Sequence, residues 1–142
     1  MKKLLAMSIA AAFAAGISCA AFAQTGAATE TSVAHAHALM AQHATTLATA
    51  QAHLHHVVNC LVGPKGQGFD AKAEDPCKGQ GNGAIPDSTS DAALHTKLQA
   101  ALADAQSGLK STSLAAAQAD AAKAAAALGD TAAQKPKGGY SW

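Results

Sequence analysis

Apolar residues recur every seven positions along the first half of the chain. They define a seam made of Val33 and Ala36, Met40 and His43, Leu47 and Ala50, Leu54 and Val57, and finally Leu61. A heptad repeat of this kind keeps one narrow face of a helix turned towards a partner helix, as in coiled coils. Gly63-Pro64 follows the last repeat, and this pair is typical of a helix end. The pattern predicts one continuous helix from about residue 31 to residue 62.

A second helical region follows a long irregular segment. Residues 63–88 are rich in glycine and proline and have no apolar periodicity, which is typical of a loop. Helical periodicity resumes after residues 88–91, whose hydroxyl and carboxylate side chains are good N-caps. Its apolar face consists of Leu94, Leu98, Leu102 and Leu109. Small and hydroxyl residues interrupt the pattern at 107–113, so we expect a kink or a break there before the alanine-rich stretch 114–128.

These elements predict an all-α protein built as one long antiparallel helical hairpin over residues 31–129, with its second arm kinked or split. Alanine has a high helix propensity but buries little apolar surface, so the core of one hairpin would be thin. We therefore expect two hairpins to associate into a four-helix bundle. Residues 24–30 are expected to form a flexible tether, and residues 130–142 a disordered tail.

The first residues have the three parts of a secretory signal peptide. Lys2 and Lys3 precede an apolar stretch over residues 4–17, and residues 21–23 place alanine at the two positions read by a signal peptidase. Cleavage is expected before Gln24, which makes residues 1–23 the signal peptide. A bilayer span needs about 20 apolar residues, so this stretch is short for a membrane anchor. Acylation at Cys19 would make a lipoprotein, but the leucine expected three residues upstream is missing. The sequence therefore predicts a periplasmic protein.

Two cysteines, Cys60 and Cys77, follow the predicted cleavage site. An exported protein with two cysteines at this spacing is expected to form a disulfide bond, here clamping the loop 63–88. The chain has no arginine, and without Lys2 and Lys3 it carries eight lysines against nine acidic residues. This balance excludes the basic face that nucleic-acid binding requires. No second long apolar run follows the signal, so we expect no membrane association after cleavage.

Seven histidines provide the candidate chemistry, and six of them lie in the predicted first helix. Imidazole is a common ligand of zinc, copper and nickel. His53 and His56 are three residues apart and share a helix face. In a hairpin closed near residues 62 and 90, position 56 lies opposite position 96, which would bring His95 close. We therefore predict a metal site formed by His53, His56 and His95 beside the disulfide.

The histidines also allow other roles. His37, Met40 and His43 could form a second group suited to copper(I), although Met40 lies on the heptad seam and is expected to pack in the core. His43 also lies on the seam, where it could be a hydrogen-bonded core residue, and outward-facing histidines could be solvated surface groups. The sequence Ala34-His35 with His37 recurs eighteen residues later, which on one continuous helix places the two copies about 27 Å apart.

Two functions follow from these patterns. The first is a periplasmic helical protein that binds a transition-metal ion through histidines. The alternative is a structural or interaction module whose heptad seam recruits a partner helix or a second copy, with no small-molecule ligand. Because no nucleophile motif, paired carboxylates or phosphate-binding loop occurs in the sequence, we expect no enzymatic activity.

Overall fold

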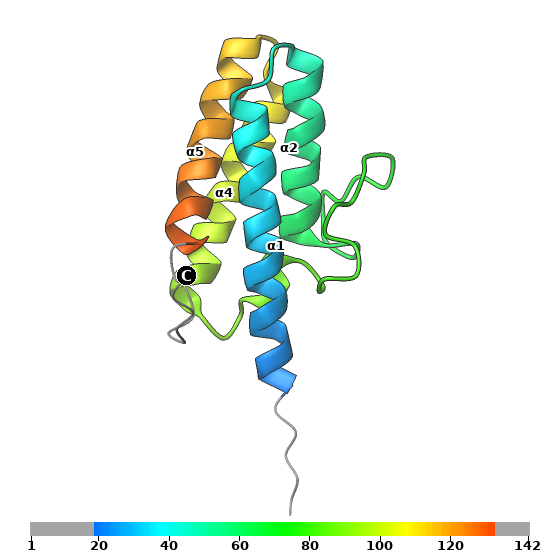
Figure 1. Cartoon of the computed structure of the whole chain (residues 1–142), viewed down its shortest axis with the longest axis vertical. Coiled ribbons are helices and arrows are strands. Elements are labelled where there is room, and N and C mark those ends of the chain that lie inside the picture. Colours follow the sequence, from blue (N-terminus) through cyan, green and yellow to red (C-terminus); the bar gives the residue numbers. More distant parts are fainter. Residues whose placement is uncertain (1–18, 133–142) are drawn as a thin grey trace, which may run out of the picture.

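The computed structural model describes residues 19–132, and this part of the chain is entirely helical or irregular, without strands (Figure 1). The helices are α1 (Cys19–Gln42), α2 (Leu47–Val62), α3 (Ala84–Asp87), α4 (Ala92–Lys110) and α5 (Leu114–Ala132). The prediction of an all-α fold is confirmed for these residues. None of the helices in residues 19–132 has the length and apolar character needed to cross a bilayer.

The four long helices form an up-down-up-down bundle within one chain. Helix α1 packs against α2 and α5, and α4 packs against α5 and α2, so α1 and α4 occupy opposite corners (Figure 1). The predicted hairpin of two arms is therefore folded once more, into two hairpins that cover each other. The buried stripes of the four helices are covered by helices of the same chain.

On each long helix the buried residues are alternately three and four positions apart. They therefore form one face, and this face points towards the core. The buried positions are Ala34, Ala38 and Ala41 in α1, Ala50, Leu54, Val57 and Leu61 in α2, Leu98, Ala101, Ala105 and Gly108 in α4, and Ala117, Ala121, Ala124 and Leu128 in α5. Such spacing keeps a narrow stripe in contact with neighbouring helices, and small residues let the helices approach closely. A Cβ atom on Gly108 would lie 2.7 Å from Cδ1 of Leu54, which shows how near α4 comes to α2.

The single first helix expected over residues 31–62 is wrong, because the chain turns at residues 43–46. Helix α1 ends at Gln42 and α2 begins at Leu47. Thr46 has extended backbone angles (φ −133°, ψ 151°), and its side-chain oxygen accepts a hydrogen bond from the backbone N–H of Thr49. This is an N-cap, which satisfies a donor at the start of a new helix.

The heptad seam is correct in α2 and wrong in α1. Met40 and Leu39 are 48% and 39% exposed, and both Ala36 and His43, which belonged to the predicted seam, are exposed as well. The buried stripe of α1 consists of alanines instead. The physical reason is that α1 packs closely against α2 and α5, where small residues fit better than the larger Met40 side chain.

The interruption predicted within 107–113 is confirmed as a turn at residues 111–113, between the end of α4 and the start of α5. Glutamine side chains tie the two turns at this end of the bundle to neighbouring helices. Gln51 Nε2 donates to the carbonyl oxygens of Leu109 and Ser111, each at 3.1 Å, and Gln118 Nε2 donates to that of Ala44 at 2.8 Å. These bonds occupy carbonyl groups that the helix ends leave without intrahelical partners.

The segment between α2 and α3 is an irregular loop fastened to α1 and α2. The predicted disulfide joins Cys60 of α2 to Cys77 of the loop, with an S–S distance of 1.95 Å and a Cα–Cα distance of 5.2 Å. Asn59 is buried beside it: its Nδ2 donates to the carbonyls of Asp70 and Glu74, and its Oδ1 accepts from the N–H of Asp70 at 2.8 Å.

Two predicted terminal segments differ from the structure. Residues 24–30, expected to be a flexible tether, belong to α1, and Ala27 and Glu30 are buried. They are ordered because α1 packs here against α3. The predicted tail begins inside α5, which extends to Ala132. Residues 1–18 of the predicted signal peptide and residues 133–142 lie outside the described part of the chain.

Candidate metal centre

Three histidines from two neighbouring helices converge on one point. His37 comes from α1, and His53 and His56 come from α2. The Nδ1 atom of His37 lies 3.2 Å from Nδ1 of His53 and 3.3 Å from Nδ1 of His56. One ring nitrogen from each residue falls within 4.8 Å of the other two, and the three side chains are half-buried. Among the described residues this is the one histidine, cysteine or carboxylate cluster with such a spacing.

The turn at residues 43–46 creates this cluster. In an antiparallel helix pair closed there, position 37 lies opposite position 52 or 53, so His37 and His53 become neighbours. His56 is about one helical turn beyond His53 on the same face of α2, so both of these side chains can reach His37. The His37 ring packs edge-on against the His56 ring, with centroids 4.8 Å apart and an interplanar angle of 85°.

The nitrogen spacing matches that of ligands around one ion. Two nitrogens bound to a tetrahedral zinc ion at about 2.05 Å each lie about 3.3 Å apart. The two Nδ1–Nδ1 distances to His37, 3.2 and 3.3 Å, have this value, and one ring nitrogen of each of the three residues lies within 4.8 Å of the others. Three protein nitrogens would leave a fourth tetrahedral position for water or another ligand.

The protonation state of the cluster favours metal binding. Burial lowers the pKa of His37 below its usual value, and the neighbouring His56 and His53 lower it further. Burial also lowers the pKa of His56, again assisted by His53. An imidazole binds a metal ion only in its neutral form, so a lowered pKa keeps the ligand nitrogens available at and somewhat below neutral pH.

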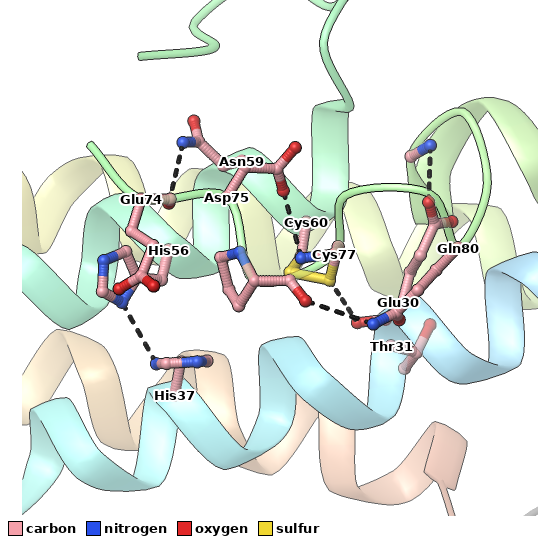
Figure 2. The surroundings of a disulfide bond; sticks show 12 residues. Glu30, Thr31, His37, His56, Asn59, Cys60, Glu74, Asp75, Cys77 and Gln80 are labelled. Carbon is pink, nitrogen blue, oxygen red and sulfur yellow. Dashed lines mark hydrogen bonds between the residues drawn. A yellow bond between two sulfur atoms is a disulfide. The ribbon is translucent and has the colours of Figure 1, made fainter. Parts of the chain in front are cut away.

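A carboxylate from the loop lies near the histidines. Glu74 raises the pKa of both His37 and His56, which opposes the effect of burial. Figure 2 shows Glu74 in the loop close to His56. Asn59 holds the backbone of this loop through the carbonyl of Glu74 at 3.3 Å. The negative charge of Glu74 would complement the positive charge of a bound ion.

Of the three predicted ligands, His53 and His56 belong to the cluster, whereas His95 does not. His95 lies against α3, where its Nδ1 is 3.1 Å from both the hydroxyl of Ser88 and the carbonyl of Ile85. Its Nε2 faces the side chain of Gln99. The predicted third ligand is replaced by His37, because α2 is paired with α1 through a turn that the heptad pattern concealed.

The remaining histidines are dispersed. His55 faces Asp70, with Nδ1 3.3 Å from Oδ2, and His35 packs next to Gly129. Met40 is exposed, so its expected packing in the core is wrong, and His43 is exposed as well, which rules out the alternative of a core histidine. Of the second predicted group, His37 belongs to the cluster with His53 and His56. The capping sequence Thr45-Thr46 was the local signal that could have revealed the turn and hence the role of His37.

Comparison with known proteins does not supply a function. No protein-family model, no curated protein and no solved structure matches this chain. The function is therefore argued from the residues and their geometry.

Proposed function

We propose that this protein is exported to the periplasm and binds a divalent transition-metal ion through His37, His53 and His56. The observation that carries the proposal is the cluster of three imidazoles, in which Nδ1 of His37 lies 3.2 and 3.3 Å from Nδ1 of His53 and His56. Zinc, copper(II) and nickel all accept imidazole ligands, and the general order of affinities places copper(II) above the other two. We propose a buffer or carrier of such an ion.

Metal binding is favoured over catalysis because the serine that contacts a histidine is not placed to act as a nucleophile. Ser88 is the hydroxyl that contacts a histidine, His95, but it is buried and donates its proton to the carbonyl of Ile85 at 2.8 Å. A catalytic serine must instead present its oxygen to a substrate. The alternative of an interaction module based on the heptad seam loses its main support, because the seam of α2 is covered inside the chain.

Isothermal titration of the purified protein with zinc, copper(II) and nickel tests metal binding. Loss of a second-sphere partner typically weakens a metal site 10- to 100-fold, so we expect His37→Ala, which removes a ligand, to weaken binding at least about 100-fold. His95→Ala is the matched control and should bind as the unmodified chain does. Equal affinities of the unmodified chain and His37→Ala, or no binding by the unmodified chain, would contradict the proposal.

Export is tested separately by expressing the whole chain in a Gram-negative bacterium and sequencing the N-terminus of the product. The proposal predicts a periplasmic product that begins at Gln24. It rests on the charged and apolar regions and the small residues before position 24. A cytoplasmic product that keeps residues 1–23 would refute export and leave the metal proposal unaffected.

A further inference from the structure

A cavity of about 570 Å³ lies between the disulfide-clamped loop and the helices α1 and α2. This size falls in the range of small-molecule sites. Its wall includes the carboxylates of Glu30, Glu74 and Asp75, the apolar side chains of Phe69 and Ala73, and the disulfide at Cys77. The wall thus combines negative charge with apolar surface. The histidine cluster is not part of it.

Glu30 is the unusual member of this wall. Its side chain is 1% exposed, and its Oε1 accepts a hydrogen bond from the backbone N–H of Gly83 at 2.9 Å. Its second oxygen, Oε2, is buried and has no hydrogen-bond partner within residues 19–132. A buried carboxylate oxygen without a donor is costly, and most buried polar atoms in proteins are paired. Glu30 is thus a residue of the cavity wall whose buried carboxylate has an unused acceptor, and Figure 2 shows the side chain beside the disulfide-clamped loop.

The groups around Glu30 are mostly acidic. Asp87 is buried next to it, since a Cβ atom on Gly81 would overlap Asp87 Oδ2 and lie 2.8 Å from Glu30 Oε1. The oxygens of Asp87 accept hydrogen bonds from the N–H and the side-chain amide of Asn82, each at 3.0 Å, so its charge is partly compensated. Of the described residues in the cavity wall, Lys78 is the basic one.

These charges affect the ionisation of Glu30. Burial raises the pKa of Glu30 to about 7; the hydrogen bond from Gly83 opposes this effect, and Asp87 and Asp75 add to it. Near neutral pH the carboxyl group is thus divided between its neutral and ionised forms. A cation placed against Oε2 would favour the ionised form and replace the missing donor.

We propose that this cavity binds a small organic cation, with an ammonium or guanidinium group donating to Glu30 Oε2. The apolar body of the ligand would lie against Phe69 and the neighbouring alanine, and Glu74 and Asp75 would add to the attraction. An inorganic ion fits less well, because these carboxylates do not converge: the described residues bring only the three histidines within 4.8 Å of one another. An anion is disfavoured by the same charges.

The test is isothermal titration of the purified, metal-free chain with butylammonium, butylguanidinium and the neutral isostere 1-butanol. We expect at least one cation to saturate a single site with a Kd below about 1 mM, and 1-butanol not to bind. Glu30→Gln keeps the size of the side chain and should weaken cation binding at least tenfold. Asp130→Asn, which alters an exposed carboxylate on α5, is the control and should change nothing.

Two further measurements, of the folding of Glu30→Gln and of the pH dependence of binding, complete the test. Helical circular dichroism establishes that Glu30→Gln is folded. If it is not, the pH series on the unmodified chain decides, because ionisation of Glu30 should tighten cation binding about tenfold between pH 6 and pH 8. Failure of both cations to bind, equal binding of 1-butanol, or undiminished binding by folded Glu30→Gln would each overturn the proposal. So would an affinity that does not change with pH.

Discussion

The bundle is held by apolar side chains, whereas the loop of residues 63–83 is held by polar side chains and one covalent bond. In the bundle, each helix repeats a stripe of alanines and leucines, and the fully buried leucines include Leu54 and Leu98. In the loop, Asn59 makes three hydrogen bonds to the backbone, and Cys60 is bonded to Cys77. Stability is thus spread over many small contacts in the bundle and concentrated in a few groups in the loop.

This difference determines which substitutions should disturb each candidate site. The ligands His37, His53 and His56 stand on bundle helices, so the centre depends mainly on the pairing of α1 with α2. The cavity and Glu74 depend on the loop. Changes confined to the loop should disturb the cavity more than the histidine cluster. The following substitutions test this contrast, from the largest expected effect to the smallest.

Leu54→Ala should have the largest effect on the bundle. Leu54 is fully buried and lies where α4 comes close to α2 at Gly108. Its truncation would therefore leave a cavity. Such changes cost about 4 kcal/mol in unfolding free energy, measured by urea titration with helical circular dichroism. Met40→Ala is the control: this side chain is 48% exposed, and its loss should cost within about 0.5 kcal/mol. Equal costs for the two would contradict the assignment of Leu54 to the core and of Met40 to the surface.

Removal of the disulfide should rank second. A double Cys60→Ala and Cys77→Ala variant should lose about 3 kcal/mol of unfolding free energy, because the open chain gains entropy in the unfolded state. Its helical content should be retained, since the bundle core lies outside the loop. Addition of a reductant should destabilise the unmodified chain and leave the double variant unchanged. A large loss of helix in the double variant would show that the loop is required for the bundle.

Glu30 should make stability fall as pH rises. Its pKa is raised from 4.5 to about 7 in the folded state, so the folded chain holds an extra proton between these values. The stabilisation is complete below about pH 4.5 and is lost as pH approaches 7, by as much as about 3 kcal/mol. His37 and His56 act oppositely at lower pH because their pKa values are lowered. The difference between the unmodified chain and Glu30→Gln isolates the glutamate, and a constant difference from pH 4.5 to 8 would refute this effect.

Asn59→Ala should destabilise the loop by about 2 kcal/mol, because it leaves buried backbone groups without partners. Hydrogen exchange should show faster exchange at the amide of Asp70, which donates to Asn59 Oδ1. Exchange in the middle of α4 and α5 should change little. Gln67→Ala, at an exposed loop position, is the control and should cost within about 0.5 kcal/mol. Uniform acceleration across the bundle would contradict the separation of the two regions.

The sequence predicted those parts of the fold that depend on local chemistry or on large side chains. The buried stripe of α2, the leucine Leu98 in α4, the interruption before α5 and the disulfide all followed from such signals. The stripe of α1 could not be predicted in the same way. When nearly every candidate residue is alanine, hydropathy does not distinguish the faces of a helix, and close packing selects the smaller side chains.

The candidate site was predicted in part. The spacing of His53 and His56 was sufficient to place them together, because helix geometry fixes it. The third ligand depended on the partner helix, and a heptad of larger residues continued through the turn at 43–46 and concealed it. The repeated histidines, expected 27 Å apart on one helix, are instead folded against each other, with His37 beside His53. The capping role of Thr46 can be read from the local sequence. The ligands come together, however, only because the turn that it caps pairs α1 with α2.

Nuclear magnetic resonance of the imidazole nitrogens during zinc titration tests the central claim most directly. The account predicts that the Nδ1 resonances of His37, His53 and His56 shift together and saturate at one zinc ion per chain. Those of His35, His43, His55 and His95 should move little. A shift of His95 together with His53 and His56, while His37 stays unchanged, would contradict the proposed metal centre.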